Sequence, residues 1–385
     1  MKKNFILLFF TIFISIITIY FFLYIYTLVN FNKDTAYKFE SRKALNFHKK
    51  YTQKLHHIRW IGAKRNKLSD YLFSEITPFK ETKKNILFHG DSWSALLTDP
   101  DFFYNESEVF VKNFSKKNNL GFVNAGTTSY SPTLMKLQLE ILEEDFNIKP
   151  NIIVAYIDQS DLGDENCRYK DKKILKNNKI IGVKTESYTG DPFDYTKIYG
   201  VSEVLLKKHN KLLTAYNLLN FNIKYKYIKT RNKNIDKLKK FIKDDFKKVK
   251  SKKCHWFDIE NYLYKSTKEE INLFKKSMRN YINYIESKEN IENLIIVTFP
   301  HKKHILEFVN SPNQKYKYNI SNLIDEVSKS SKKTFHLNFT KLIERKEILI
   351  NEVDYLEDYQ SHITPNFYKN HFIKKITEQI IYNTN

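Results

Sequence analysis

The chain has 385 residues, which is enough for one large domain or two modest ones with a substantial core. Its charge is strongly basic, with 65 Lys and Arg against 43 Asp and Glu and a formal net charge of +22. Nearly all the basic residues are Lys, scattered along the whole chain, which argues against a nucleic-acid-binding surface. An anionic glycan or a membrane surface is an equally good electrostatic partner.

An uninterrupted apolar and aromatic run begins the chain, from Phe5 to Val29. It exceeds the ~20 residues that cross a hydrocarbon core, so we interpret 1–4 as a short tail and 5–29 as one transmembrane anchor. A cleaved signal peptide is the alternative, but no Ala-x-Ala-like site follows the run. Lys2 and Lys3 favour a cytoplasmic N-terminus, whereas basic residues beyond the run favour the opposite. Because long domains translocate largely regardless of charge, we expect an extracytoplasmic (periplasmic) body.

Residues 30–82 form a basic juxtamembrane connector. Its apolar residues recur at helical spacing, which predicts a stalk and one packing helix; they are Leu68, Tyr71, Leu72 and Ile76.

A short apolar run, Ile86 to Phe88, predicts a buried strand that stops at a glycine turn, Gly90-Asp91-Ser92-Trp93. The residues that follow, 94–97, are compatible with the first turn of a helix. A strand, a tight glycine turn and a helix start present a serine hydroxyl at the carboxyl edge of a parallel sheet, where backbone N–H groups can meet an oxyanion. Ser92 is therefore the candidate nucleophile, although Gly-Asp-Ser also occurs in ordinary turns.

Strands and helices alternate through the rest of the chain. The capping pair Ser266 and Glu269 predicts a helix start, and Pro132 fits the first turn of another. Alternation of this kind predicts a parallel sheet with helices on both faces and a ligand beyond the carboxyl ends of the strands. The predicted strands are 121–126, 150–157, 294–298 and 334–338, and the predicted helices are 132–146, 266–287, 321–328 and one running to the C-terminus.

A histidine near the C-terminus, His362, follows an acidic residue and precedes the last helix. The ordinary role of such a histidine is at the surface or in capping. The position of His362 favours a catalytic role instead, because Ser92 ends the first strand and His362 begins the last helical segment. We predict that His362 is the base that activates Ser92 and that Asp358 orients its imidazole, with Asp354 as the alternative acid.

These pieces resemble the motif blocks of the SGNH (GDSL-type) hydrolase superfamily, from about Asn85 to the C-terminus. Residues 90–93 are similar to the first block, and Asn124-Ala125-Gly126 to the second. The third block normally reads Gly-x-Asn-Asp, whereas this chain has Asp158-Gln159-Ser160-Asp161. The last block normally places Asp three residues before His, and here the spacing is four. The Asp-x-x-Ser-His form that results is closer to the polysaccharide-modifying branches.

The resemblance implies a flavodoxin-like three-layer α/β/α fold with a parallel sheet over 83–385. It implies Ser92 as nucleophile, His362 as base and Asp358 as orienting acid. The oxyanion would be held by the N–H groups of Ser92 and Gly126, with Gln159 as the nearest side-chain amide.

A Lys-rich insertion at about 163–265 would follow the third strand and overhang the site, or its lysines would form solvated helix faces. It begins with a predicted hairpin (169–174 and 179–184), and helices are predicted at 204–220 and 235–250. Cys167 and Cys254 bracket most of it, and we predict that they form a disulfide in an oxidising compartment, closing a loop worth ~4 kcal/mol. Two free thiols are the alternative.

Neither a cofactor nor a metal is expected. The histidines that could be ligands lack Cys or acidic partners at ligand spacing; they are His56, His57, His301 and His304.

The function expected from these features is that of a membrane-anchored SGNH-type serine esterase or O-acyltransferase. Its substrates would be acyl esters, with acetyl favoured, of an envelope carbohydrate. The expected partners are the membrane, an acylated carbohydrate and envelope polysaccharide-modification machinery, but not nucleic acid. The alternative is a catalytically silent SGNH-like module that binds or scaffolds glycan.

Overall fold

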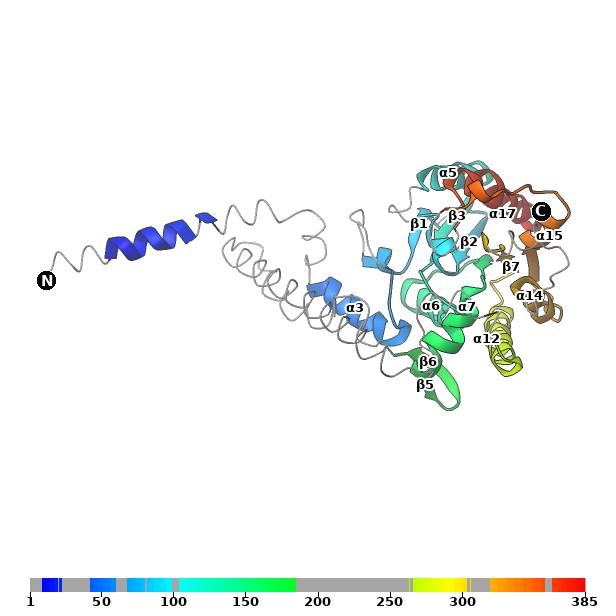
Figure 1. Ribbon diagram of the computed structural model, residues 1–385, viewed down its shortest axis with the longest axis horizontal. Helices are drawn as coiled ribbons and strands as arrows, with labels where there is room; N and C mark the ends of the chain where they lie inside the picture. The colour runs from blue at the N-terminus through cyan, green and yellow to red at the C-terminus, as the bar shows by residue number, and fades with distance from the viewer. Residues whose placement is uncertain are drawn as a thin grey trace, which may run out of the picture. The chain divides into compact units, whose positions relative to one another are not determined.

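The computed structural model separates into two compact units, Met1–Thr52 with Thr185–Lys252 and Gln53–Lys184 with Lys253–Asn385. The second unit carries every described strand (Figure 1). The described residues are 9–19, 21–22, 42–59, 68–79, 82–98, 104–184, 263, 266–302, 305, 319–356 and 362–384.

In the first unit, residues 9–19 and 21–22 are helical, and their large apolar side chains are exposed. Helix α3 (Arg42–Leu55) begins in this unit. None of the helices in the described ranges combines the length and the apolar character needed to cross a bilayer. Several residues of the predicted anchor at 5–29 lie outside the described residues, so the anchor stays a prediction.

The second unit is built on a six-stranded sheet whose strand order is β1-β3-β2-β4-β7-β8. All neighbouring strands pair in parallel except β1, which is antiparallel to β3 and lies at the edge. The predicted α/β fold is confirmed, but the sheet is mostly rather than wholly parallel. The strands are β1 (Ser74–Thr77), β2 (Lys84–His89), β3 (Leu120–Asn124), β4 (Ile152–Tyr156), β7 (Asn293–Thr298) and β8 (Thr334–Asn338).

The five parallel strands, numbered along the chain, have the spatial order 2-1-3-4-5. In doubly wound sheets of this order the connections switch faces between strands 1 and 3, and ligands bind beyond the carboxyl ends at that switch point. Here those two strands are β2 and β4. The loops that follow them, at residues 90–92 and 157–160, therefore occupy the place where such a fold holds its ligand.

Helices cover both faces of the sheet, with α6, α12 and α14 on one and α5, η6 and α17 on the other (Figure 1). His89, at the end of β2, contacts Gln138 of α6 at 2.9 Å and Tyr281 of α12 at 2.8 Å. Phe88 faces the other way, into the apolar core that includes α17. These helices are α5 (Asn105–Asn118), α6 (Pro132–Phe146), α12 (Lys268–Glu286), α14 (Ile320–Ser328), the π-helical turn η6 (Tyr368–Ile373) and α17 (Lys374–Thr384).

Short helical turns fill the connections. Three of them matter for the site, namely α4 (Ser92–Ala95), which follows β2, α7 (Ser160–Gly163), which follows β4, and α16 (Pro365–Phe367), which precedes η6. The others are η1 (Leu68–Tyr71), the π-helical turn η3 (Asp164–Arg168), η4 (Lys170–Lys172), α15 (Phe339–Glu344) and η5 (Glu352–Asp354).

The helix predicted within residues 68–76 is wrong. Only η1 is helical, and Ile76 belongs to edge strand β1, which pairs with β3. Tyr71, Leu72 and Ile76 are all buried, but by a turn and a strand in succession. A short edge strand has too few residues to show the two-residue alternation that would separate it from a helical pattern.

The predicted capping box is one residue too early. Thr267, not Ser266, caps α12, since its hydroxyl accepts the N–H of Glu270 at 3.2 Å and its own N–H donates to the Glu270 carboxylate at 2.8 Å. The sequence Ser-Thr followed by Glu-Glu offers two registers with the same chemistry.

The predicted hairpin is present as β5 (Lys173–Lys176) and β6 (Lys179–Val183). Its two turn residues, Asn177 and Asn178, have φ values of 49° and 58°. Two consecutive left-handed residues are what a two-residue type I′ turn requires, and Asn tolerates them. The helices predicted at 204–220 and 235–250 lie outside the described residues.

Candidate active site

Ser92 lies at the first position of α4, directly beyond the end of β2. Gly90 makes the turn, with φ of +137°, and a Cβ there would lie 2.7 Å from the carbonyl oxygen of Tyr156. Asp91 caps α4, since its carboxylate accepts the N–H of Trp93 at 2.9 Å. The turn therefore needs glycine both for its backbone conformation and for its contact with β4.

The structure brings Ser92 and His362 together across 270 residues of chain, with Ser92 Oγ 3.0 Å from His362 Nε2. Both side chains are buried. The carbonyl of His362 accepts the N–H of Leu356 at 2.6 Å, and the next residue, Ile363, forms a β-bridge with Tyr355. The Trp93 ring meets the imidazole edge-to-face, at 5.5 Å between centroids.

Of the two predicted acids, Asp358 lies outside the described residues. Asp354 is described, and its carboxylate accepts the N–H of Asn351 at 2.7 Å, which caps η5. Its backbone carbonyl accepts the N–H of Thr364 at 2.7 Å. The observed role of Asp354 is therefore to hold the chain on either side of His362.

The two predicted oxyanion groups outside α4 lie at the same edge of the sheet. Gly126 follows β3 and packs so closely on α4 that a Cβ would lie 2.4 Å from the Ala95 nitrogen. Its N–H donates to the Asn124 side chain at 2.9 Å, so it would have to share or exchange that bond to meet an oxyanion. Gln159 is buried in the loop after β4, at the start of α7.

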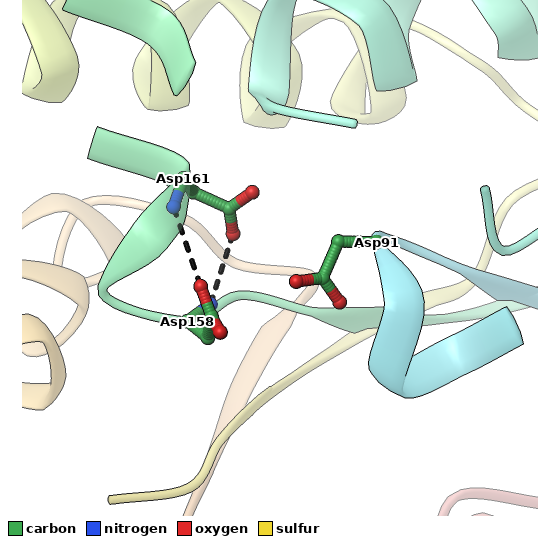
Figure 2. Close-up of side chains that lie close together, drawn as sticks. All are labelled: Asp91, Asp158 and Asp161. Carbon is green, nitrogen blue, oxygen red and sulfur yellow. Dashed lines mark hydrogen bonds between the residues drawn. The ribbon is translucent and has the colours of Figure 1, made fainter. Parts of the chain in front are cut away.

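Three buried aspartates gather beside this turn, as Figure 2 shows. Asp91, Asp158 and Asp161 each offer a carboxylate oxygen, and these oxygens lie within 4.8 Å of one another. Asp161 accepts the backbone N–H of Asp158 at 2.9 Å. Asp158 accepts the N–H and the hydroxyl of Ser160, both at 2.6 Å, and its other oxygen lies 3.0 Å from His301 Nε2.

The three carboxylates differ in charge. Burial, followed by repulsion from Asp158, raises the pKa of Asp91 well above its ordinary value. Burial, followed by repulsion from Asp91 and Asp158, does the same to the pKa of Asp161. Burial would also raise the pKa of Asp158, but the hydrogen bond and charge of His301 and the bonds from Ser160 outweigh it, so that pKa is lowered. Asp158 is thus the member that ionises most readily, whereas Asp91 and Asp161 keep their protons to a higher pH than an ordinary carboxyl group.

Carboxylate oxygens are the ligands that Mg²⁺ and Ca²⁺ prefer, which makes the three aspartates a candidate cation site. Both oxygens of Asp158 already accept hydrogen bonds, and one oxygen each of Asp91 and Asp161 accepts a backbone N–H. The buried Oδ1 of Asp161 is without a hydrogen-bond partner. These few free oxygens fit carboxyl groups that carry protons better than they fit the six or more ligands of a divalent cation.

Sequence reasoning places Asp158 to Asp161 beyond a strand end but misses that two of its aspartates gather with Asp91 and that His301 joins them. His301 was considered only as a metal ligand, yet it follows β7 and reaches Asp158 at the neighbouring strand end. The signal that could have found these residues is their position, because each lies just beyond a buried parallel strand.

The remaining predicted ligands and cysteines have these places. His57 contacts the Thr128 carbonyl at 2.8 Å, and burial lowers its pKa to about 4. His56 lies 3.0 Å from His57, ring nitrogen to ring nitrogen, and burial lowers its pKa to about 2. Cys167 is disulfide-bonded. Cys254 and His304 lie outside the described residues.

No family model matches the chain, and no curated protein matches it. Among solved structures it is similar to LAE5, an α/β hydrolase enzyme from the metagenome of Lake Arreo, Spain. The identity is 9%, the TM-score is 0.37, and the match covers 80% of this chain and 97% of that one. A likeness this distant assigns neither a fold family nor an activity to this chain.

Proposed function

We propose that this protein is an SGNH-type serine esterase or O-acyltransferase that acts on acyl esters, with acetyl favoured, of an envelope carbohydrate. The observation that carries the proposal is the 3.0 Å contact between Ser92 Oγ and His362 Nε2. It lies beyond the carboxyl end of β2, at the switch point of a doubly wound sheet. A serine beside a histidine base at that place is the arrangement that nucleophilic catalysis requires.

In the proposed reaction His362 takes the proton of Ser92 as Oγ forms a bond to the acyl carbon. The carbonyl π electrons move to oxygen and give a tetrahedral oxyanion. The oxyanion collapses, the ester C–O bond breaks, and His362 returns the proton to the leaving sugar hydroxyl. A second hydroxyl compound then attacks the acyl-Ser92 ester by the same steps. Water as that acceptor gives an esterase, and a sugar hydroxyl gives a transferase.

The oxyanion would be met by the N–H groups of Ser92 and Gly126, with the Gln159 amide as a third donor. Gly126 supports this because it approaches α4 without a side chain in between. Asp358 would orient the imidazole of His362, as the spacing of the last motif suggests.

Substrate and location rest on the sequence. The apolar run at 5–29 supports a single-pass membrane protein with an extracytoplasmic catalytic body. The net charge of +22 supports an anionic carbohydrate, and envelope polysaccharide-modification machinery would supply it.

The test is covalent labelling of the full-length protein by a fluorophosphonate, followed by mass analysis of the labelled peptide. We expect labelling at Ser92, no labelling of Ser92→Ala, and normal labelling of Ser94→Ala. Ser94 is a matched control because it is a buried serine two residues away whose hydroxyl donates to the His89 carbonyl at 2.9 Å. Turnover of p-nitrophenyl acetate with and without a sugar acceptor separates transferase from esterase.

A catalytically silent glycan-binding module is the second candidate. The bond from the Gly126 N–H to Asn124 favours it, because that N–H is already in use, and so does the altered third motif. Glycan binding by a wild-type protein that no fluorophosphonate labels would establish this reading.

A further inference from the structure

Two buried tyrosines connect the Ser92 turn to the His362 segment. The Tyr368 hydroxyl donates to the carbonyl of Trp93, the residue after Ser92, at 2.9 Å. The Tyr104 hydroxyl donates to the carbonyl of Ile363, the residue after His362. Each residue of the dyad is therefore followed by a peptide group that a tyrosine holds.

The two tyrosines also hold each other. Their rings meet edge-to-face, with centroids 5.0 Å apart and planes 85° apart. Both are almost completely buried, with 1% of Tyr104 and none of Tyr368 exposed. Tyr104 is the N-cap residue of α5, and Tyr368 begins η6, so the pair joins two helices on one face of the sheet.

We propose that Tyr104 and Tyr368 are positioning residues that fix the distance between Ser92 and His362. The proposal rests on the proposed function for its kinetic consequences. A continuous path runs from the Trp93 carbonyl through the two rings to the Ile363 carbonyl, and it bypasses the long stretch of chain between the dyad residues.

The Tyr104 bond ties the His362 segment to the helical layer, beside a second tether from the Tyr355 hydroxyl to the Pro300 carbonyl at 3.0 Å. Ser92 is fixed by β2 and by the Gly90 turn, but His362 lies outside the six-stranded sheet. Its described backbone contacts, through Leu356 and the Tyr355–Ile363 bridge, join it to the residues just before it in the chain. The Tyr104 bond instead joins it to α5, which packs on the sheet. A displacement of about 1 Å at a reacting pair can cost ~10²-fold in rate, so this connection bears on catalysis.

The Tyr368 hydroxyl remains a donor over the working pH range. Burial, with the neighbouring Tyr104 and Asp91, raises the pKa of Tyr368 well above its ordinary value. Removing either hydroxyl leaves a buried carbonyl without its donor, and the local backbone must then move or stay unpaired.

The experiment compares Tyr104→Phe, Tyr368→Phe and the double variant in the full-length protein, with Tyr169→Phe as the matched control. Tyr169 is also fully buried, and its hydroxyl donates to the Ser129 carbonyl at 2.6 Å. All three single variants should lose a similar amount of thermal stability, because each loses one buried hydroxyl–carbonyl bond. Only the Tyr104 and Tyr368 variants should lose kcat, by ~10-fold with KM nearly unchanged, since a misplaced dyad affects the transition state rather than binding.

The double variant should be no slower than the slower single variant, because cutting one path twice does no more than cutting it once. Unchanged kcat in both single variants, with stability lost as in Tyr169→Phe, would overturn the proposal and leave a packing role. If the losses of kcat in the two single variants multiply in the double variant, the two tyrosines act independently, and the idea that they form one path is overturned as well.

A second readout does not need turnover. In protein labelled with ¹⁵N-histidine, the His362 imidazole signals, assigned by their loss in His362→Asn, report its contact with Ser92. They should shift in both pair variants and stay in place in Tyr169→Phe. If the wild-type protein shows no turnover and no fluorophosphonate labelling, the proposed function fails. The positioning role of Tyr104 and Tyr368 is still tested in that case: unmoved His362 signals would overturn it, and shifted signals would support it.

Discussion

Among the described residues, two contacts pair a histidine with a serine or threonine hydroxyl, and only one is a good candidate for catalysis. Ser92 lies 3.0 Å from His362 beyond β2. Thr298, the last residue of β7, lies 2.8 Å from His336, whose other ring nitrogen lies 2.7 Å from Asp325. Asp325, His336 and Thr298 thus form the hydrogen-bonded sequence of acid, imidazole and hydroxyl that defines a catalytic triad.

Its surroundings argue against a nucleophile. The Thr298 hydroxyl also contacts Ser321 at 2.9 Å, and Ser321 contacts Thr340 at 3.1 Å. Thr298 therefore belongs to a series of three buried, hydrogen-bonded hydroxyls between β7, α14 and α15. Thr298 is within a strand, whereas Ser92 follows a glycine turn and begins a helix. The comparison of the two sets indicates that a catalytic hydroxyl needs a turn at the switch point of the sheet as much as it needs its hydrogen bonds.

The largest expected effect separates the two hydroxyls. Ser92→Ala should lower kcat on p-nitrophenyl acetate by ~10⁴–10⁶-fold, and His362→Ala should be as damaging, because triad members act as a unit. Thr298→Val should keep kcat but lower the unfolding free energy by ~1–3 kcal/mol, since it leaves buried partners unpaired. Turnover and denaturant unfolding on the same preparations measure both. A Ser92→Ala protein as active as wild type would end the enzyme proposal.

The acids should separate in the same way. Asp358→Asn should lower kcat by up to ~10⁴-fold by leaving the imidazole in the wrong tautomer. Asp325→Asn, in the second set, should leave kcat unchanged. A larger loss in Asp354→Asn than in Asp358→Asn would show that the acid is misassigned, and comparison of kcat for the three variants decides.

A smaller effect is expected at the oxyanion. Gln159→Ala should lower kcat by ~10²–10³-fold if its amide meets the developing charge. KM should change little, because the interaction is made in the transition state. Equal kcat for Gln159→Ala and wild type would remove the amide from the oxyanion hole and leave the two backbone donors.

The smallest effect is on stability, and its sign differs between the regions. Asp161 has a raised pKa, so the folded protein binds its proton more tightly than the unfolded chain, and this stability is lost as pH rises above the unfolded pKa. Asp325 has a lowered pKa, because bonds from Lys341 and His336 outweigh its burial, so its stability is lost as pH falls through the folded pKa. Asp161→Asn should therefore lessen the decline of Tm between pH 5 and 9, a window above the unfolded pKa of ~4. Asp325→Asn should instead lessen the decline in acid. Identical Tm profiles for Asp161→Asn and wild type would contradict the assignment of the buried proton.

Much of the parallel sheet could be predicted from sequence because its strands are continuous apolar runs. Helix α6 was predicted at its observed bounds, Pro132–Phe146, because proline marks its first turn and apolar residues recur through it. The meeting of Ser92 with His362 could be predicted from the place of Ser92 at a strand end, the place of His362 at the start of the last helical segment, and the motif resemblance. These features depend on local pattern and on the general rule for where such sheets place a site.

The rest depends on tertiary contacts that leave no local pattern. The Asp91 group forms only when the loops after β2 and β4 meet, and His301 joins it from a third strand. Tyr104 and Tyr368 are ordinary aromatic residues until the fold brings their hydroxyls to two particular carbonyls. Edge strand β1 was missed because four residues cannot display a period.

The turn that carries Ser92 is joined to both helical layers. His89, three residues before Ser92, contacts α6 and α12, and Trp93, the residue after it, packs on Phe372 of η6 and Phe299. Because both layers hold the turn, opening of one layer leaves the turn held by the other, so its amide hydrogens should exchange only in the most complete unfolding events. Loosening the nucleophile would thus require loosening the core itself, and variation in substrate preference is left to the loops around it.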